Sequence, residues 1–381
     1  MQATQIPLSL YVHIPWCVRK CPYCDFNSHE QKGELPEQAY VDALIEDLRS
    51  DLDAVQGRKI GSVFFGGGTP SLFSPQAIGR ILEQVDQLVP FADDVEITLE
   101  ANPGTVEAAR FAGLRSAGVN RLSMGVQSLA DDKLAALGRI HGRAEALAAV
   151  EAARAAGFDN FNLDLMYALP GQSLAQAEAD LRELLALKPP HVSWYQLTLE
   201  PNTLFYKRPP VLPDDDAIGD IMDMGLAVLA EHGFEQYEIS AHAQPGHECR
   251  HNLNYWQFGD YLGIGAGAHA KLTQSDGRIL RLTRQRHPQR YLEDAAGRVS
   301  SRRELGREEL PIEFMLNALR LNAGVPSELF TQRTGLALSL IAPQLEQARE
   351  RGLLEADPAR LQPSELGRRF LNDLLAIFEP D

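Results

Sequence analysis

The sequence predicts an α/β fold in which six strand–helix units form a partial (β/α)6 barrel, followed by a mainly helical C-terminal domain. Segments rich in β-branched and apolar residues alternate six times with amphipathic segments, which is the pattern of a parallel sheet covered by helices. The alternation then stops, and from residue 311 the pattern is mainly helical. A partial barrel is therefore favoured over a closed eight-stranded barrel.

The strands and helices can be placed from the period of their apolar residues and from the turn residues between them. The predicted strands cover residues 8–14, 60–65, 95–99, 121–127, 161–167 and 192–199. The predicted helices cover residues 36–55, 75–89, 106–117, 131–137, 144–156 and 174–187. In barrel-like α/β sheets, ligand-binding residues gather where strands end, and polar or glycine-rich residues do follow these strands.

The C-terminal part resembles a winged-helix arrangement. Helices are predicted at residues 311–321, 327–334, 339–352 and 364–378, with a short hairpin within 353–362. A winged helix suggests DNA binding, but residues 308–381 hold 7 Lys/Arg against 12 Asp/Glu, and the whole chain has a net charge of −16. Because phosphate contacts need a basic surface, no nucleic-acid partner is expected. We divide the chain into a core (1–240), a linker region (241–307) and a helical C-terminal domain (308–381).

The strongest functional signal is a group of three cysteines, Cys17, Cys21 and Cys24, after the first predicted strand. Their C-x3-C-x2-C spacing can hold a four-iron cluster and leave one iron open to a ligand. A structural zinc site is the alternative, with His29 or Cys249 as fourth ligand, but neither spacing is typical of zinc sites. A disulfide would need an oxidising compartment. We therefore predict a [4Fe-4S] cluster.

The composition favours a cytoplasmic globular protein. Apolar residues make up 44% of the chain, which is enough for a packed core. The first seven residues have no cationic segment followed by an apolar one, so no signal peptide is expected. No run approaches the roughly 18 apolar residues that span a bilayer. In the cytoplasm thiols stay reduced, and an iron–sulfur cluster can be assembled.

The cysteine spacing resembles that of the radical S-adenosylmethionine (SAM) superfamily, so a barrel of the radical-SAM type is expected. In that superfamily the open iron binds the amino and carboxylate groups of SAM, and an electron from the cluster cleaves SAM into methionine and a 5′-deoxyadenosyl radical. The run Gly66–Pro70 resembles the GGGTP segment that holds the amino group of SAM. Taken alone, this run would be interpreted as a tight turn that lets backbone approach a ligand.

Further motifs resemble the oxygen-independent coproporphyrinogen dehydrogenase family over essentially the whole chain. They are YVHIPWC at 11–17, the GGGTP run, MGVQS at 124–128 and DLMYALPG at 164–171. In that family two SAM molecules bind; the sequence leaves open whether one or two bind here. The resemblance places around the cluster-bound SAM the residues Tyr11, Gly67 and Glu100. It places around a second SAM, or between the two, the residues Tyr23, Gly68, Thr69, Gln127, Arg139 and Asp164.

Two departures distinguish this chain from the dehydrogenase. The dehydrogenase has a further cysteine two residues after the third cluster cysteine, where this chain has Phe26. It also carries a longer N-terminal extension that contributes to its active site, whereas this chain reaches its first cluster cysteine at residue 17. Both departures count against coproporphyrinogen decarboxylation. We assign no catalytic residue, and the sequence leaves open whether SAM is cleaved productively.

The segment His251-Asn252-Leu253-Asn254-Tyr255-Trp256 resembles the heme-chaperone branch of the same family. Imidazole can ligate heme iron, and the rings of Tyr255 and Trp256 are flat apolar faces for a porphyrin. Taken alone, a histidine beside aromatic residues would be interpreted as structural. The resemblance predicts a heme chaperone with a SAM-liganded [4Fe-4S] cluster that transfers heme to acceptor proteins. The alternative is an oxygen-independent coproporphyrinogen III dehydrogenase.

Two further features have weaker interpretations. Residues 271–307 hold ten Lys/Arg and four Asp/Glu. We interpret this segment as a solvated face, with contact to heme propionates or to an acidic membrane surface as the alternatives. Cys249 is expected to be a free thiol, with heme ligation as its alternative. The sequence predicts neither the acceptor, nor the heme linkage, nor the oligomeric state.

Overall fold

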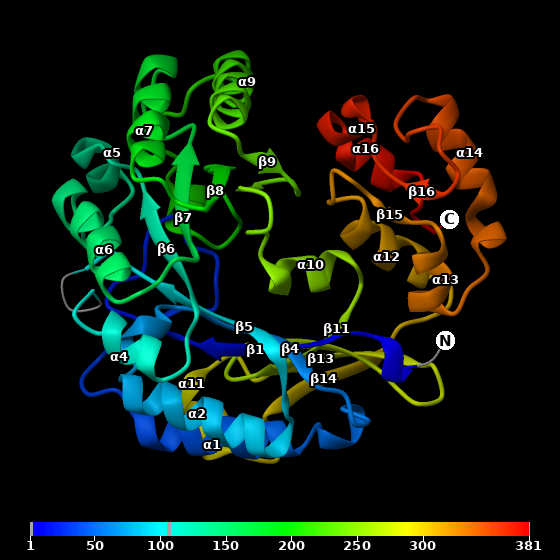
Figure 1. The fold of residues 1–381 in the computed structure, drawn as a ribbon, viewed down its shortest axis with the longest axis horizontal. Helices are drawn as coiled ribbons and strands as arrows, with labels where there is room; N and C mark the ends of the chain where they lie inside the picture. Colours follow the sequence, from blue (N-terminus) through cyan, green and yellow to red (C-terminus); the bar gives the residue numbers. More distant parts are fainter. Residues whose placement is uncertain (1–2, 105–107, 381) are drawn as a thin grey trace.

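The computed structural model describes residues 3–104 and 108–380 (Figure 1). One sheet of twelve strands organises them, in the order β14-β13-β12-β11-β1-β4-β5-β6-β7-β8-β10-β9. Its six central strands are parallel to one another: β1 (Leu8–Ile14), β4 (Ile60–Gly67), β5 (Phe91–Ala101), β6 (Arg121–Gln127), β7 (Phe161–Tyr167) and β8 (His191–Gln196). Strands β1 and β4 run across the view and β6 and β7 run up it, so the sheet curves into a partial barrel (Figure 1). The predicted fold class is confirmed.

Helices cover the outside of the curved sheet (Figure 1). They are α1 (Glu37–Arg49), α2 (Pro75–Leu88), α4 (Phe111–Ser116), α5 (Asp131–Ala136), α6 (Arg143–Ala155), α7 (Leu174–Ala186) and α9 (Asp215–Glu231). Helix α2 shows why such segments are helical: the Ser74 hydroxyl accepts the N–H of Ala77, and Pro75 occupies the first turn. Its apolar stripe, which includes Ile78 and Ile81, faces the core.

Several short elements connect these units. They are the 3-10 turns at Ala3–Gln5, Leu52–Ala54, Pro70–Leu72 and Leu338–Ile341, the pair β2 (Trp16–Cys17) and β3 (His29–Glu30), and α8 (Leu204–Lys207). The helix predicted at 36–55 ends at Arg49, and the turn at Leu52–Ala54 follows it. Part of the helix predicted at 106–117 lies outside the described residues, and α4 is its described portion.

Residues 241–307, expected as a linker region, contribute strands to both edges of the same sheet. They form β10 (Ala241–Ala243), α10 (Arg250–Trp256), β11 (Asp260–Ile264), β12 (His269–Thr273), β13 (Ile279–Arg284), α11 (Pro288–Glu293) and β14 (Val299–Glu304). Strand β10 pairs with β8, and β9 (Glu235–Gln236) pairs with β10. At the opposite edge β11 pairs in parallel with β1, and β12 to β14 continue antiparallel. The division of the chain at 240 and 307 stays a prediction.

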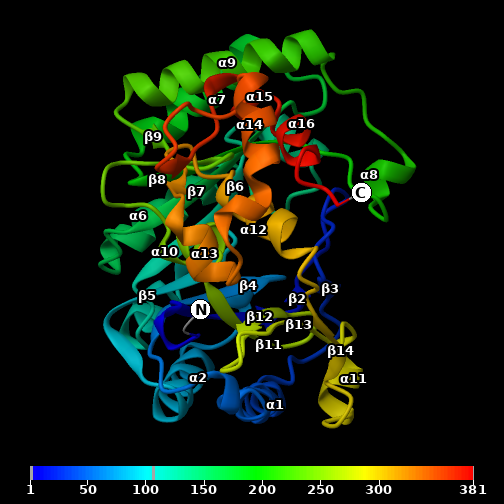
Figure 2. The same cartoon turned by 90° about the vertical axis from the view of Figure 1, so that its right-hand side faces the viewer.

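The C-terminal residues form a second apolar core beside the sheet. Its elements are α12 (Leu310–Ala318), β15 (Val325–Pro326), α13 (Glu328–Thr334), α14 (Ala342–Glu350), β16 (Arg360–Leu361), α15 (Glu365–Arg369) and α16 (Leu371–Ala376). The ring of Phe314 packs edge-to-face on Phe258 and Phe330, which joins this core to the segment after α10. Seen from the side, these helices lie above β11–β14 (Figure 2).

The short hairpin predicted within 353–362 is present: Leu354 bridges Pro363 in antiparallel fashion, and the Glu355 N–H donates to Gln362 O at 2.9 Å. Strand β16 also pairs with β15. One prediction for this part needs correction. The helix predicted at 364–378 divides at Phe370 into α15 and α16. Among the described residues, no helix is both long and apolar enough to cross a membrane.

Candidate functional site

A cavity of about 460 Å³ extends along the inside of the barrel. Its outer part is lined by residues at the carboxyl ends of strands, such as Gln127 and Gln196. Its inner part is lined by residues at the beginnings of the same strands, Arg121 and His191, and by Asn252 on α10. Residues in one strand alternate between two faces, so the inward face of β6 contributes Arg121, Ser123, Gly125 and Gln127 to one wall.

The three predicted cluster cysteines all line the outer part of this cavity as free thiols. Cys17 is buried at the end of β2, which pairs with β3, and the Cys24 N–H donates to the Cys21 carbonyl at 3.1 Å. Burial, together with the neighbouring thiols of Cys24 and Cys21, raises the pKa of Cys17 to about 11. Burial and the neighbouring thiols therefore disfavour the thiolate form of Cys17, and a bound metal cation would favour it.

Among the described residues, no three Cys, His, Asp or Glu side chains converge as a single metal ion requires. A four-iron cluster binds each cysteine through a different iron, so its ligands do not have to converge on one point. The donor set is therefore compatible with a cluster.

The glycine run after β4 is docked against the segment that precedes the first cysteine. The Gly68 N–H donates to Ile14 O at 2.8 Å, and the Thr69 N–H donates to Trp16 O at 2.7 Å. A Cβ atom on Gly68 would collide with the carbonyl group of Trp16. Gly67 has a φ of +116° and donates its N–H to Glu100 Oε2 at 3.1 Å. Both glycines are thus required by backbone geometry at the cavity wall.

This geometry predicts that Gly68→Ala weakens SAM binding about tenfold or more, because the added methyl group must displace Trp16 and the neighbouring Cys17. The measurement is the change that SAM causes in the EPR spectrum of the reduced cluster, with iron content determined in parallel. Gly219→Ala in α9 is the matched control, since a Cβ there meets no atom within 4 Å. An unchanged SAM response and iron content in Gly68→Ala would contradict the prediction.

Two acidic side chains face the cavity. Burial and the nearby Asp164 raise the pKa of Glu100 to about 8, with the Gly67 N–H acting in the opposite direction. Burial also raises the pKa of Asp164, which accepts a hydrogen bond from Asn162 Nδ2 at 2.7 Å. A cationic ligand would stabilise the ionised form of both acids. The sulfonium and ammonium groups of SAM fit this requirement.

Arg139 connects the glycine run to the cysteine loop. Its Nη2 atom donates to Asn102 Oδ1 at 2.6 Å and to Gly125 O at 2.8 Å, and its Nη1 atom donates to Cys21 Sγ at 3.6 Å. The Asn102 amide in turn donates to Thr69 Oγ1 at 2.9 Å. Arg139 thus places a positive charge beside the sulfur atom of a predicted cluster cysteine.

The structure brings together most of the residues that the sequence predicts for SAM. The cavity is lined by Tyr23, Gly67, Gly68, Thr69, Glu100, Gln127, Arg139 and Asp164. Tyr11 lies behind the glycine run, with its hydroxyl 3.1 Å from His13 Nδ1 and its ring beside Phe64. Their roles toward SAM stay predictions.

The predicted heme motif lies on α10, inside the curve of the sheet (Figure 1). His251 is buried, with Nδ1 3.1 Å from Ser62 Oγ and Nε2 2.9 Å from the Tyr255 hydroxyl. Burial lowers the pKa of His251 to about 3, so its ring is neutral. The Tyr255 ring packs on Tyr261 at 4.4 Å, and the Arg320 guanidinium lies 4.2 Å from the Trp256 ring. The contacts with Ser62 and Tyr261 hold α10 against β4 and β11, and the contact with Arg320 joins it to the C-terminal part. None of the three predicted heme contacts lines the cavity.

Sequence reasoning missed other cavity residues. They include Asn102, Arg121, Asn162 and His191, and also Asn252, which was predicted only as part of the heme motif. Asn102 stands in the strand-end segment Glu100–Pro103 and could have been found there. The residues at strand beginnings could have been found only by working out which alternate positions of each strand point into the barrel.

Comparison with known proteins identifies the family. Residues 11–184 match the model of the radical SAM superfamily, and residues 305–370 match the HemN C-terminal domain. The protein named Heme chaperone HemW of Escherichia coli (strain K12) is 54% identical over 373 residues, which cover 98% of each chain. The chain belongs to the HemW family. HemW of Bacillus subtilis (strain 168) is 33% identical over 376 residues, covering 97% of this chain and 98% of that protein.

Further relatives extend this result. The mitochondrial Radical S-adenosyl methionine domain-containing protein 1 of Bos taurus is 36% identical over 381 residues, covering 96% of this chain and 86% of that protein. Among solved structures, coproporphyrinogen III oxidase (HemN) from Escherichia coli, titled a radical SAM enzyme, has a TM-score of 0.82 at 24% identity and covers 99% of this chain and 91% of its own. That likeness shows the fold. The cofactors of the radical SAM family are a [4Fe-4S] cluster and SAM, and the cavity residues fit both.

Proposed function

We propose that this protein is a heme chaperone, which binds heme and a SAM-liganded [4Fe-4S] cluster and transfers the heme to acceptor proteins. The observation that carries the proposal is the 54% identity, over 98% of the chain, to a protein named Heme chaperone HemW. We further propose that it acts in the cytoplasm, where thiols such as those of Cys17, Cys21 and Cys24 stay reduced.

The chain's own residues have defined tasks in this proposal. The three cysteines hold the cluster, and the backbone of Gly67 and Gly68 admits SAM close to it. Glu100 and Asp164 attract the cationic groups of SAM, and Arg139 orients Cys21. When bound, the cluster supplies one-electron reduction and a Lewis-acidic iron. Phe26, which is 60% exposed, lines the cavity where the dehydrogenase has its additional cysteine.

His251 is the candidate heme contact. Both of its ring nitrogens are engaged, with Ser62 and Tyr255, so heme ligation through Nε2 requires the Tyr255 hydroxyl to release it. The basic segment 271–307 gives less support to a membrane contact, because six of its ten cations form ion pairs within the described residues: Lys271, Arg278, Arg281, Arg284, Arg298 and Arg303.

Titration with heme tests the proposal. The purified protein is expected to bind about one heme per chain, seen by visible absorption, and to leave coproporphyrinogen III unconsumed in an anaerobic assay with SAM and reductant. His251→Ala should lower heme retention and keep the cluster, whereas Tyr255→Phe should keep or strengthen heme binding because it frees Nε2. Equal heme binding by His251→Ala would remove His251 from the proposal. Conversion of coproporphyrinogen III by the wild-type protein would restore the dehydrogenase alternative.

A further inference from the structure

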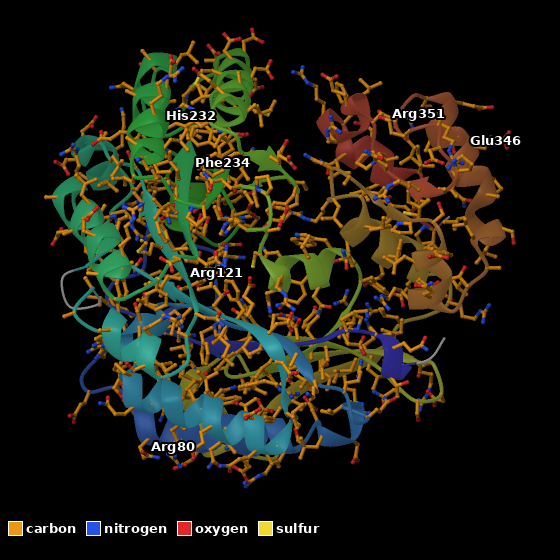
Figure 3. The ribbon with its side chains drawn as sticks, viewed as in Figure 1. Arg80, Arg121, His232, Phe234, Glu346 and Arg351 are labelled. Carbon is orange, nitrogen blue, oxygen red and sulfur yellow. The ribbon has the colours of Figure 1, made fainter. Side chains whose placement is uncertain are left out.

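We propose that Arg121 binds a carboxylate group of a ligand that enters the inner part of the cavity. Arg121 is the first residue of β6 and is among the largest fully buried side chains, with 2% of its surface exposed. It lines the cavity at the end opposite to the cluster cysteines. Figure 3 shows it between the base of β6 and α10.

The guanidinium of Arg121 has no partner among the described residues. Its Nε atom makes no hydrogen bond, and none of the ion pairs or side-chain hydrogen bonds of these residues includes Arg121. Two other buried arginines are paired: Arg58 lies 2.8 Å from Asp260, and Arg284 binds both Asp47 and Asp51. Because arginine stays protonated and a buried charge is costly unless it is paired, the cavity contains a cation with no anion of the described residues in direct contact.

No acidic group that the structure describes contacts Arg121 directly. Burial lowers the pKa of its guanidinium, but nearby groups that include Glu96 and Asp164 raise it overall, so these carboxyl groups lie within electrostatic range without pairing with it. Glu96 Oε1 accepts from the Cys249 thiol at 3.5 Å and from the His251 N–H at 3.2 Å. Burial raises the pKa of Cys249 to about 12, so its thiol is uncharged. His191 is held at both ring nitrogens, by Asn162 at 2.7 Å and by Tyr237 at 2.9 Å. An anionic ligand group is therefore the partner that this end of the cavity can accept.

The chemistry of a guanidinium selects the kind of anion. Its planar set of N–H donors matches a carboxylate in two parallel hydrogen bonds. On the proposed function, two ligands can bring a free carboxylate to this end of the cavity, namely a second SAM in its methionyl group and heme in its propionates, because the carboxylate of the cluster-bound SAM is held by the open iron at the other end. The site follows from Arg121 and the cavity, and only the choice between these two ligands rests on the proposed function.

Substitution of Arg121 tests the site in the cluster-containing protein. The probes are labelled SAM in equilibrium dialysis, heme in absorption titration, and heme dimethyl ester, in which the propionates are uncharged. Arg121→Gln is expected to weaken binding of SAM or of heme about tenfold or more, leaving heme dimethyl ester unaffected, and Arg121→Lys is expected to retain part of the affinity. Loss for SAM alone identifies the methionyl carboxylate, and loss for heme alone identifies a propionate.

Stability separates this role from a structural one. Since no direct ion pair or hydrogen bond of the guanidinium within the described residues is lost, Arg121→Met is expected not to lower the Tm of the ligand-free protein. Arg80→Gln on the outside of α2 is the matched control, because its guanidinium pairs with the exposed Asp42 (Figure 3). Unchanged affinity for both SAM and heme, or a lowered Tm with equal loss for all three probes, would overturn the proposal. If the wild-type protein binds no heme, the proposed function fails, and the SAM measurement still tests Arg121.

Discussion

Replacing any one of Cys17, Cys21 and Cys24 by alanine is expected to remove most of the iron–sulfur cluster, which is the largest effect we expect from a single substitution in this chain. The three thiols line one part of the cavity, and each would bind a different iron, so the loss of one opens the cluster. Anaerobic reconstitution followed by iron and sulfide determination measures the effect. The wild type should hold about four irons and four sulfides per chain.

Cys249→Ala is the matched control for these variants. Its thiol is buried at the start of α10, donates to Glu96, and lines the inner part of the cavity near Arg121. This variant should keep the full iron content. If Cys249→Ala loses as much iron as the other three variants, the cluster has four protein ligands and no open iron for SAM.

The central strands were predictable because their residues are nearly all buried and are bounded by turn residues. The predicted limits of 8–14, 121–127 and 161–167 agree with β1, β6 and β7. Strand β11 was not predictable as a neighbour of β1, because Leu8 pairs with Asp260 across some 250 residues of chain and local periodicity contains no information about such pairing. The segment 271–307 was interpreted as a solvated face for the same reason, although Lys271 and Arg284 are buried.

The candidate site was predictable to the extent that it lies at strand ends. Glu100 and Gln127 were found in this way, and both line the cavity. Arg121 stands at the beginning of β6, and the expectation that ligand-binding residues gather where strands end does not indicate such a position. The environment of His251 depends on Ser62, which is 189 residues away in the sequence, so no motif could indicate that both ring nitrogens are engaged.

Asp260→Asn is expected to destabilise the protein by about 3–5 kcal/mol, because it removes one member of a buried charge cluster. The carboxylate of Asp260 is fully buried and accepts hydrogen bonds from Arg58 at 2.8 Å, from Lys271 at 2.9 Å, and from the N–H and hydroxyl of Thr273 at 2.8 and 2.9 Å. Without its charge, two buried cations lose their anion. The free energy of unfolding in urea at pH 7 measures the effect.

Asp93→Asn provides the control for this measurement. The Asp93 carboxylate is 98% exposed and lies 3.3 Å from Lys59, so its removal should change the free energy of unfolding by no more than about 0.5 kcal/mol. A loss below about 1 kcal/mol in Asp260→Asn would show that the buried cluster contributes no more than a surface pair.

The pH dependence gives the same cluster a second test. Burial alone would raise the pKa of Asp260, but Lys271 and Arg58 lower it below its usual value overall. A carboxyl group with a lowered pKa in the folded state contributes stability above its unfolded pKa of about 3.9, and this contribution is lost as the pH falls through the folded pKa. The wild type should therefore lose more stability below about pH 4 than Asp260→Asn does, because asparagine does not titrate. Parallel stability curves for the two proteins over this range would mean that Asp260 is not ionised in the fold.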